Sequence, residues 1–295
     1  MVMYTIKGLL KKGVNILRES NIDNPMLDGE VLLMHVLDID RVGLIRDRDR
    51  ILEMDFINDY LMLIEERKQG KPVQYITGHQ EFMGLDFAVG EGVLIPRPDT
   101  EILVERVLEL LNGTENPKIA DLCTGSGAIG VSLAYYIKDA YVYAADLSKD
   151  ALKYCRVNAL KNSVMDRFKI YEGNLADPLF LEGLEGELNA LVSNPPYISS
   201  GEMESLPASV RCYEPHLALC GGEEGLDFYE KILKDAPRLL RKGGILAFEI
   251  GYNQGEALKK MINSTGKFAD INIEKDLAGF DRCVYCYFEG VDKYV

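Results

Sequence analysis

The second part of the chain alternates short apolar segments with longer amphipathic ones, and this alternation restricts the possible folds more than any other feature. From residue 117 onward, segments of strand-like length and composition occur at 118–122, 141–145, 168–171, 190–193 and 244–250. Segments with helical periodicity lie between them, near 128–137, 148–161 and 226–240. This order is typical of a mostly parallel, doubly wound sheet. We therefore predict an α/β fold, to which strands at 270–274 and 282–288 add a terminal antiparallel hairpin.

The first 80 residues have a different, helical pattern. Apolar side chains follow helical spacing from Ile6 to Leu17 and again further along. Residues 80–95 then combine alternating apolar residues with three glycines, which indicates a β-hairpin. We predict a small helical domain at 1–80, a β-hairpin connector at 81–97 and the α/β domain at 98–295. The side chain of Asp99 or Thr100 is expected to cap the first helix of that domain.

The charge balance is acidic, since 33 Lys and Arg against 47 Asp and Glu give a net charge of −14. A field of this sign repels phosphate backbones, so a basic protein partner is favoured over nucleic acid. No segment approaches the roughly 20 consecutive apolar residues of a membrane span, and no membrane association is expected. The six cysteines are too scattered for a disulfide framework, which favours a reduced, cytoplasmic setting.

Only Cys283 and Cys286 form a C-x-x-C pair, and they lie in a predicted strand. Residues three apart on a strand face opposite sides of the sheet. No second Cys or His pair completes a zinc site, so no metal is expected.

A Gly-rich segment, DLCTGSGAIG, begins at Asp121 at the end of the first predicted strand. Gly125 and Gly127 let the backbone turn tightly and approach a ligand closely. Asp146, at the end of the second strand, can accept both ribose hydroxyls of an adenosine. With Gly130 the segment also fits the dinucleotide pattern, so NAD stays open on this feature alone. Asp121 favours S-adenosylmethionine, because a carboxylate pointing at the ligand suits a sulfonium and repels a pyrophosphate.

Asn194-Pro195-Pro196-Tyr197 follows the fourth predicted strand, where open α/β sheets place their reactive groups. The two prolines fix φ and hold the preceding residues in extended geometry. The side-chain oxygen of Asn194 and the carbonyl of Pro195 can each accept one hydrogen of an NH₂ group, while the Tyr197 ring packs against it. Such acceptors orient a poorly nucleophilic planar nitrogen and stabilise the charge that develops on it. The segment predicts methyl transfer to an amide or amine nitrogen.

These motifs resemble class I, Rossmann-like methyltransferases that modify planar nitrogens, and further segments resemble the PrmC/HemK family along the whole chain. The segments are EFMGLDFAV, IPRPDTE, SNPPYIS, YEPHLALCGGEEGLDFYEKI, FEIGYNQG and DLAGFDRCVY. The resemblance implies methylation of the side-chain amide of the glutamine in the Gly-Gly-Gln motif of class-1 peptide chain release factors. It implies S-adenosylmethionine as the methyl donor and a helical N-terminal domain that helps to dock the release factor.

The resemblance also implies the site residues. The expected cofactor ligands are Asp121, Cys123, Thr124, Gly125, Ser126, Gly127, Asp146, Asn174, Leu175 and Asn194, with the adenine near Asn174 and Leu175. The expected substrate ligands are Asn194, Pro195, Pro196 and Tyr197, of which Asn194, Pro195 and Tyr197 are the expected catalytic residues. Two residues depart from the family pattern. Cys123 stands where glycine is frequent, and Asn174 stands where an acid is common, so the adenine contact is expected to differ there.

Three alternatives stay open on the sequence. A nucleic-acid methyltransferase acting on the exocyclic amine of adenine or guanine uses similar sites on an extruded base. An NAD-dependent oxidoreductase would use the glycine pattern, and a non-catalytic binding module would keep only the pocket. Arg97, Glu101 and Glu249 are further candidates to which the sequence assigns no role.

Overall fold

The computed structural model describes residues 4–290 and divides the chain into two compact units. The first unit contains the described residues up to His79 together with the segment 207–213. The second contains 80–206 and the described residues from Glu214 onward. The domain limits predicted from the sequence differ here, because they place residues 207–213 in the α/β domain at 98–295. Residues 1–3 and 291–295 of the predicted domains lie outside the described residues.

The first unit is helical. Its helices are α1 (Ile6–Glu19), α2 (Pro25–Leu37), α3 (Arg41–Arg46), α4 (Met54–Lys68), α5 (Val73–Thr77) and α10 (Ala208–Arg211). Helix α1 begins at Thr5, whose hydroxyl accepts a hydrogen bond from the Gly8 N–H at 3.1 Å. Tyr60 of α4 is fully buried and donates to the Gly29 carbonyl of α2 at 3.2 Å. A Cβ at Gly13 would clash with the Tyr60 hydroxyl oxygen, so glycine permits α1 to pack closely against α4.

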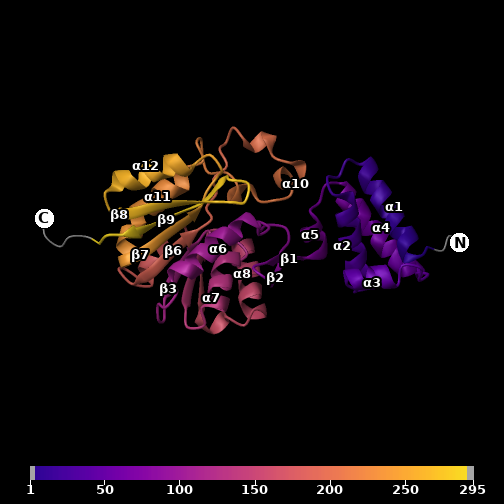
Figure 1. The fold of residues 1–295 in the computed structure, drawn as a ribbon, viewed down its shortest axis with the longest axis horizontal. Helices are drawn as coiled ribbons and strands as arrows, with labels where there is room; N and C mark the ends of the chain where they lie inside the picture. The colour runs from indigo at the N-terminus through magenta and orange to yellow at the C-terminus, as the bar shows by residue number, and fades with distance from the viewer. Residues whose placement is uncertain (1–3, 291–295) are drawn as a thin grey trace. The chain divides into compact units, whose positions relative to one another are not determined.

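The second unit is built on a seven-stranded sheet with the order β5-β4-β3-β6-β7-β9-β8. Figure 1 labels β3, β6, β7, β8 and β9 of this sheet. The strands are β3 (Lys118–Leu122), β4 (Tyr141–Asp146), β5 (Phe168–Glu172), β6 (Leu188–Ser193), β7 (Leu240–Glu249), β8 (Phe268–Lys275) and β9 (Asp281–Phe288). Strands β3 to β7 pair in parallel, and β9 runs antiparallel to both β7 and β8. The predicted doubly wound sheet with a terminal antiparallel hairpin is confirmed.

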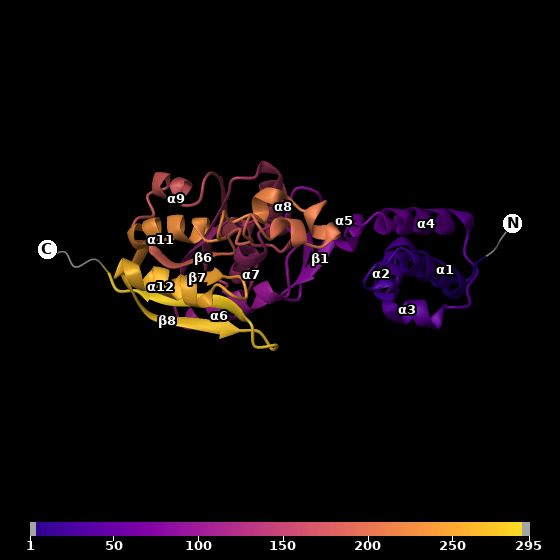
Figure 2. The same cartoon turned by 90° about the horizontal axis from the view of Figure 1, so that it is seen from above.

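Helices cover both faces of this sheet (Figure 2). On one face they are α6 (Asp99–Leu110), α7 (Ala128–Tyr136) and α8 (Lys149–Lys161). On the other face they are α9 (Asp177–Leu181), α11 (Asp227–Leu239) and α12 (Gly255–Thr265). Short 3₁₀ turns occur at η1 (Met165–Arg167), η2 (Met203–Ser205) and η3 (His216–Ala218). Cys283 and Cys286 of β9 face opposite layers, as predicted: Cys283 packs with the α6–α8 layer and Cys286 with the α11–α12 layer.

A two-stranded hairpin precedes the sheet, formed by β1 (His79–Phe82) and β2 (Leu85–Ala88). Phe82 and Phe87 are buried in the layer of α6 to α8 and meet edge to face at 5.9 Å. The buried Asn158 of α8 joins this hairpin to the Gly-rich turn. Its amide exchanges hydrogen bonds with both backbone groups of Ala88 and donates to the Ser126 carbonyl at 2.8 Å.

The start of α6 corrects one prediction. The N-cap residue is Pro98, without a side-chain hydrogen bond, so neither Asp99 nor Thr100 caps the helix. Asp99 instead pairs with Arg282 of β9 at 3.1 Å, and Thr100 is buried.

No helix among residues 4–290 has the length and apolar character needed to cross a membrane. Over the same residues, no group of three or more His, Cys, Asp or Glu side chains is arranged to hold a metal ion.

Candidate active site

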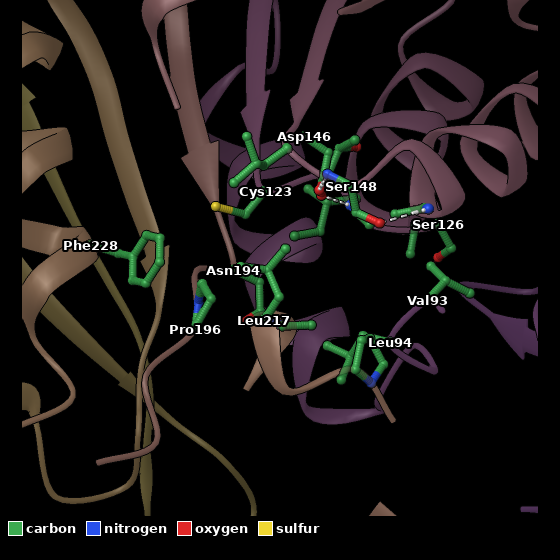
Figure 3. A pocket seen from close by; sticks show the side chains of 18 of the residues that line it. Val93, Leu94, Cys123, Ser126, Asp146, Ser148, Asn194, Pro196, Leu217 and Phe228 are labelled. Atoms are coloured by element: carbon green, nitrogen blue, oxygen red, sulfur yellow. Dashed lines mark hydrogen bonds between the residues drawn. The ribbon is translucent and has the colours of Figure 1, made fainter. Parts of the chain in front are cut away.

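A cavity of about 210 Å³ opens at the carboxyl ends of the central strands (Figure 3). It lies where the chain order reverses, because β4 follows on one side of β3 and β6 pairs with the other side. Open α/β sheets bind ligands at such switch points. Nine of the predicted site residues line the cavity: Cys123, Thr124, Gly125, Ser126, Asp146, Asn174, Leu175, Asn194 and Pro196. The structure therefore brings the Gly-rich turn, the end of β4, the loop after β5 and the Asn-Pro-Pro-Tyr loop to one place.

Asp146 ends β4 and organises the Gly-rich turn. Its Oδ2 accepts a hydrogen bond from the Gly125 N–H at 2.8 Å, and its Oδ1 accepts one from the Ser148 N–H at 2.8 Å. Burial raises the pKa of this carboxyl, while the backbone donors act to lower it. Each oxygen of a carboxylate has two lone pairs, so a hydrogen bond from one backbone donor does not exhaust its capacity to accept. The group can therefore accept from a diol in the cavity.

The position of Asp121 corrects the sequence analysis. Its side chain is fully buried and is absent from the cavity wall. Oδ2 accepts from the Thr124 hydroxyl at 2.6 Å and from the Gly130 N–H at 2.9 Å. The carboxyl therefore ties the turn to the start of α7 and does not point at the ligand. Burial raises its pKa to about 7 despite both hydrogen bonds.

Three residues of the turn, Cys123, Gly125 and Gly127, have left-handed backbone conformations that favour glycine. Cys123 has φ +57° and places its sulfur at the cavity (Figure 3). This conformation gives a physical reason for glycine at the position. Gly127 has φ +83° and is the N-cap of α7, outside the cavity wall. A Cβ there would approach the Cys155 sulfur to 3.0 Å, so Gly127 shapes the turn without lining the cavity.

Asn194 reaches the cavity from the end of β6 (Figure 3). Its Nδ2 donates to the Thr100 hydroxyl oxygen at 3.3 Å. Within residues 4–290, its Oδ1 accepts no side-chain or backbone hydrogen bond. The amide therefore presents an uncommitted acceptor, which is the polarity needed to bind an NH₂ group. Pro196 lines the cavity beside it, whereas Pro195 is buried and is not among the lining residues.

Tyr197 does not line the cavity. Its hydroxyl donates to Glu249 Oε1 at 3.2 Å, and its carbonyl accepts from Gln254 Nε2 at 3.0 Å. These two hydrogen bonds anchor the loop after Pro196 to Glu249, at the end of β7, and to Gln254, which follows β7. Packing of the Tyr197 ring against a substrate stays a prediction.

The three unassigned candidates occupy different environments. Arg97 lines the cavity and forms an ion pair with the buried Glu214, which also accepts from the Ile95 N–H at 3.3 Å. Glu101 lies outside the cavity wall, and its carboxylate accepts from the Met83 N–H at 2.6 Å. Glu249 is buried beneath Tyr197.

Sequence reasoning missed part of the cavity wall. Phe228 of α11 and Leu217 of η3 also line it (Figure 3). The neighbouring sequence does not mark either residue as part of a site, because each is a single apolar side chain in a segment of both polar and apolar residues. Glu214 was also missed, since its partner Arg97 lies 117 positions earlier in the chain.

Comparisons with known proteins agree with this geometry. Residues 8–78 match the family described as PrmC N-terminal domain, and residues 98–208 match the methyltransferase small domain. A protein of Clostridium acetobutylicum, named release factor glutamine methyltransferase, is 43% identical over 279 residues, covering 95% of this chain and 97% of that protein. A protein of the same name from Moorella thermoacetica is 44% identical over 283 residues, covering 96% of this chain and 98% of the relative.

Among solved structures, the catalytic domain of hMettl16 has a similar fold. It aligns with a TM-score of 0.57 and 15% identity, over 84% of this chain and 87% of that chain. This likeness concerns the fold alone.

Proposed function

Because the chain belongs to the release factor glutamine methyltransferase family, we propose that it methylates the side-chain amide nitrogen of the glutamine in the Gly-Gly-Gln motif of class-1 peptide chain release factors. The methyl donor is S-adenosylmethionine. The observation that carries the proposal is the orientation of Asn194. Its Nδ2 is bonded to Thr100, and its Oδ1 is left to accept within the same cavity that holds Asp146 and the Gly-rich turn.

The residues of the cavity fit the methyl donor. The carboxylate oxygens of Asp146 suit the ribose hydroxyls, and residues 123–126 of the Gly-rich turn line the same cavity. Asn174 and Leu175 would contact the adenine, with Leu175 supplying apolar surface. When bound, S-adenosylmethionine supplies a methyl group that is already activated by its sulfonium. The chain's own task is therefore to orient the acceptor nitrogen.

The Asn-Pro-Pro-Tyr loop performs this orientation. The Oδ1 of Asn194 accepts one N–H of the glutamine amide, and the Pro195 carbonyl accepts the other. Pro196 and Tyr197 flank the flat amide. Both acceptors stabilise positive charge on the nitrogen as its lone pair leaves conjugation with the carbonyl. No nucleophilic side chain takes part.

We further propose that the helical domain at 1–80 docks the release factor and that the α/β domain at 98–295, entered through the connector at 81–97, carries out the transfer. The acidic net charge suits a basic protein surface and disfavours nucleic acid. The protein then acts in the cytoplasm, without a membrane or nucleic-acid partner.

Methyl transfer to a purified release factor tests this function. We expect that mass spectrometry after incubation with S-adenosylmethionine locates one added methyl on the glutamine of the Gly-Gly-Gln motif. A release factor with alanine at that glutamine is the matched control and should stay unmodified. Labelling of tRNA or DNA in place of the release factor would support the nucleic-acid alternative, and binding of NADH without S-adenosylmethionine would support the oxidoreductase.

A further inference from the structure

Gln254 is a buried amide that joins three backbone groups near the carboxyl end of β7. It is the N-cap residue of α12 and is 8% exposed. Its Nε2 donates to the Tyr197 carbonyl at 3.0 Å and to the Gly225 carbonyl at 3.2 Å. Its Oε1 accepts from the Gly251 N–H at 2.9 Å. The amide orientation is therefore fixed, because the reverse would place its oxygen against two carbonyl oxygens and its NH₂ against an N–H donor.

Gly225 brings a second backbone segment against the same carbonyl. It has φ +73°, and a Cβ at this position would clash with the Tyr197 carbonyl oxygen and lie 2.8 Å from Gln254 Nε2. This close approach therefore requires glycine. The two segments also meet through the backbone, since the Gly221 N–H donates to the Ile198 carbonyl at 2.8 Å.

The Asn-Pro-Pro-Tyr loop is thus held at both ends. At its start, Ser193 of β6 pairs with β3 on one side and β7 on the other. At its end, Gln254 holds the Tyr197 carbonyl. Between these anchors, the two prolines fix φ and keep the residues before them extended. The position of the Pro195 carbonyl therefore depends on both anchors.

We propose that Gln254 is a positioning residue for methyl transfer, which holds the Pro195 carbonyl in place through the Tyr197 carbonyl. Neither Gln254 nor Gly225 is among the residues that line the cavity, so the amide acts on the loop and does not touch the methyl donor. The inference rests on the proposed function, because it concerns one of the two oxygens that accept the N–H groups of the glutamine amide. Loss of the Gln254 amide should therefore slow the transfer while binding of the donor stays intact.

Gln254→Met is the direct test, because methionine has a similar length but offers no N–H donor. We expect kcat for release-factor methylation to fall by about 10-fold to 100-fold, as for other misplaced reacting groups. The Kd for S-adenosylmethionine, measured by calorimetry, and the KM for release factor should stay within about threefold.

Asn189→Leu is the matched control, because it also replaces a buried amide by an apolar side chain of similar size. Asn189 accepts from the Lys118 N–H at 3.0 Å and lies near the start of β6, whereas the cavity lies at its end. Its loss should leave kcat within about twofold of the wild type.

Gly225→Ala tests the same contact from the other side, and it keeps the test decisive if Gln254→Met does not fold. The added methyl group clashes with the Tyr197 carbonyl oxygen, so kcat should fall as in Gln254→Met, with the Kd for S-adenosylmethionine again within about threefold. Gly243→Ala is its matched control. Gly243 has φ +75°, and a Cβ there would meet no atom of residues 4–290 within 4 Å. This variant carries a similar backbone strain without the clash, and its kcat should stay within about twofold.

The double variant tests whether the two substitutions act on one group. Because Gln254→Met and Gly225→Ala both displace the Tyr197 carbonyl, the double variant should be no more than about twofold slower than the slower single variant. Independent effects would multiply instead.

The outcomes separate this inference from the proposed function. If the wild-type protein leaves the release factor unmodified, the proposed function fails. If the wild type is active and Gln254→Met or Gly225→Ala retains its kcat, or if their effects multiply, the positioning role is overturned. It is overturned as well if the affinity for S-adenosylmethionine falls as far as kcat, because Gln254 would then support the whole cavity and not the loop.

Discussion

The Gly-rich turn after β3 and the Asn-Pro-Pro-Tyr loop after β6 lie at the ends of neighbouring strands but are held in different ways. The turn is fixed mainly through its backbone: Asp146 accepts from the Gly125 N–H and Asp121 accepts from the Gly130 N–H. The loop is fixed by contacts between side chains, of Asn194 with Thr100 and of Tyr197 with Glu249. Backbone anchoring leaves the side chains of the turn open to change, as at Cys123. Side-chain anchoring makes the loop sensitive to each substitution.

The largest expected effect is that of Asn194→Ala on the rate. Removal of the Oδ1 acceptor should lower kcat by about 100-fold to 1,000-fold, as for one lost group of an oxyanion hole. The Kd for S-adenosylmethionine should change by less than about fivefold, because the turn is anchored elsewhere. Labelled methyl transfer and calorimetry measure the two quantities. A variant as active as the wild type would remove the role assigned to this side chain.

Asp146→Ala should instead weaken the binding of S-adenosylmethionine more than it lowers kcat. Loss of a carboxylate that bonds both the turn and the ribose should weaken the affinity for S-adenosylmethionine by about 10-fold to 100-fold. Asp146→Asn is the matched control and should bind better than the alanine variant, because one oxygen acceptor is retained. Calorimetry checks both. Unchanged affinity in Asp146→Ala would show that the turn does not depend on this anchor.

The buried acids of the two regions predict the pH dependence of stability. Burial raises the pKa values of Asp121 and Glu249 to about 7. Between about pH 4 and pH 7 the native state then binds more protons than the unfolded state, so the free energy of unfolding falls as the pH rises. We expect a loss of about 1–3 kcal/mol across this window from each group. Urea unfolding at several pH values measures this loss.

Asp121→Asn and Glu249→Gln are the controls for this slope. Each variant should flatten the dependence, because it removes one titrating group. A slope as steep as that of the wild type in both variants would assign the effect to other acids.

The sequence predicted most of the sheet because its strands are buried on both faces and form apolar runs that end in polar residues. The predicted strand at 118–122 coincides with β3, and Asp146 ends β4 at the cavity. The direction of Asp121 was wrong for a local reason. Strand alternation places Asp121 on the same face as Ile119, which packs in the layer of α7. Asp121 was predicted to point at the ligand because it lies just before the Gly-rich turn, although the alternation of the strand directs its side chain to the opposite side.

Other parts of the site depend on residues far apart in the chain, and no local pattern specifies them. Tyr197 and Glu249 are separated by 52 positions, and Asn194 and Thr100 by 94. The prolines of the loop indicated rigidity but not its anchors. Likewise, the segment 207–213 belongs to the helical unit through contacts such as that of the Tyr213 hydroxyl with the Gln69 carbonyl at 3.0 Å.

Substitutions of Cys123 are expected to have the smallest effects, and they test whether the turn tolerates a change of side chain. A residue with a Cβ at φ +57° is strained by about 1–2 kcal/mol, and glycine relieves this strain at some cost in unfolded-state entropy. Cys123→Gly should therefore be more stable than Cys123→Ala by about 1 kcal/mol in urea unfolding, since both lack the sulfur and only alanine keeps the strain. Both variants should bind S-adenosylmethionine within about threefold of the wild type. If either variant bound tenfold more weakly, the sulfur at the cavity would itself contribute to recognition. The turn would then depend on its side chains as the Asn-Pro-Pro-Tyr loop does, and the contrast between the two regions would fail.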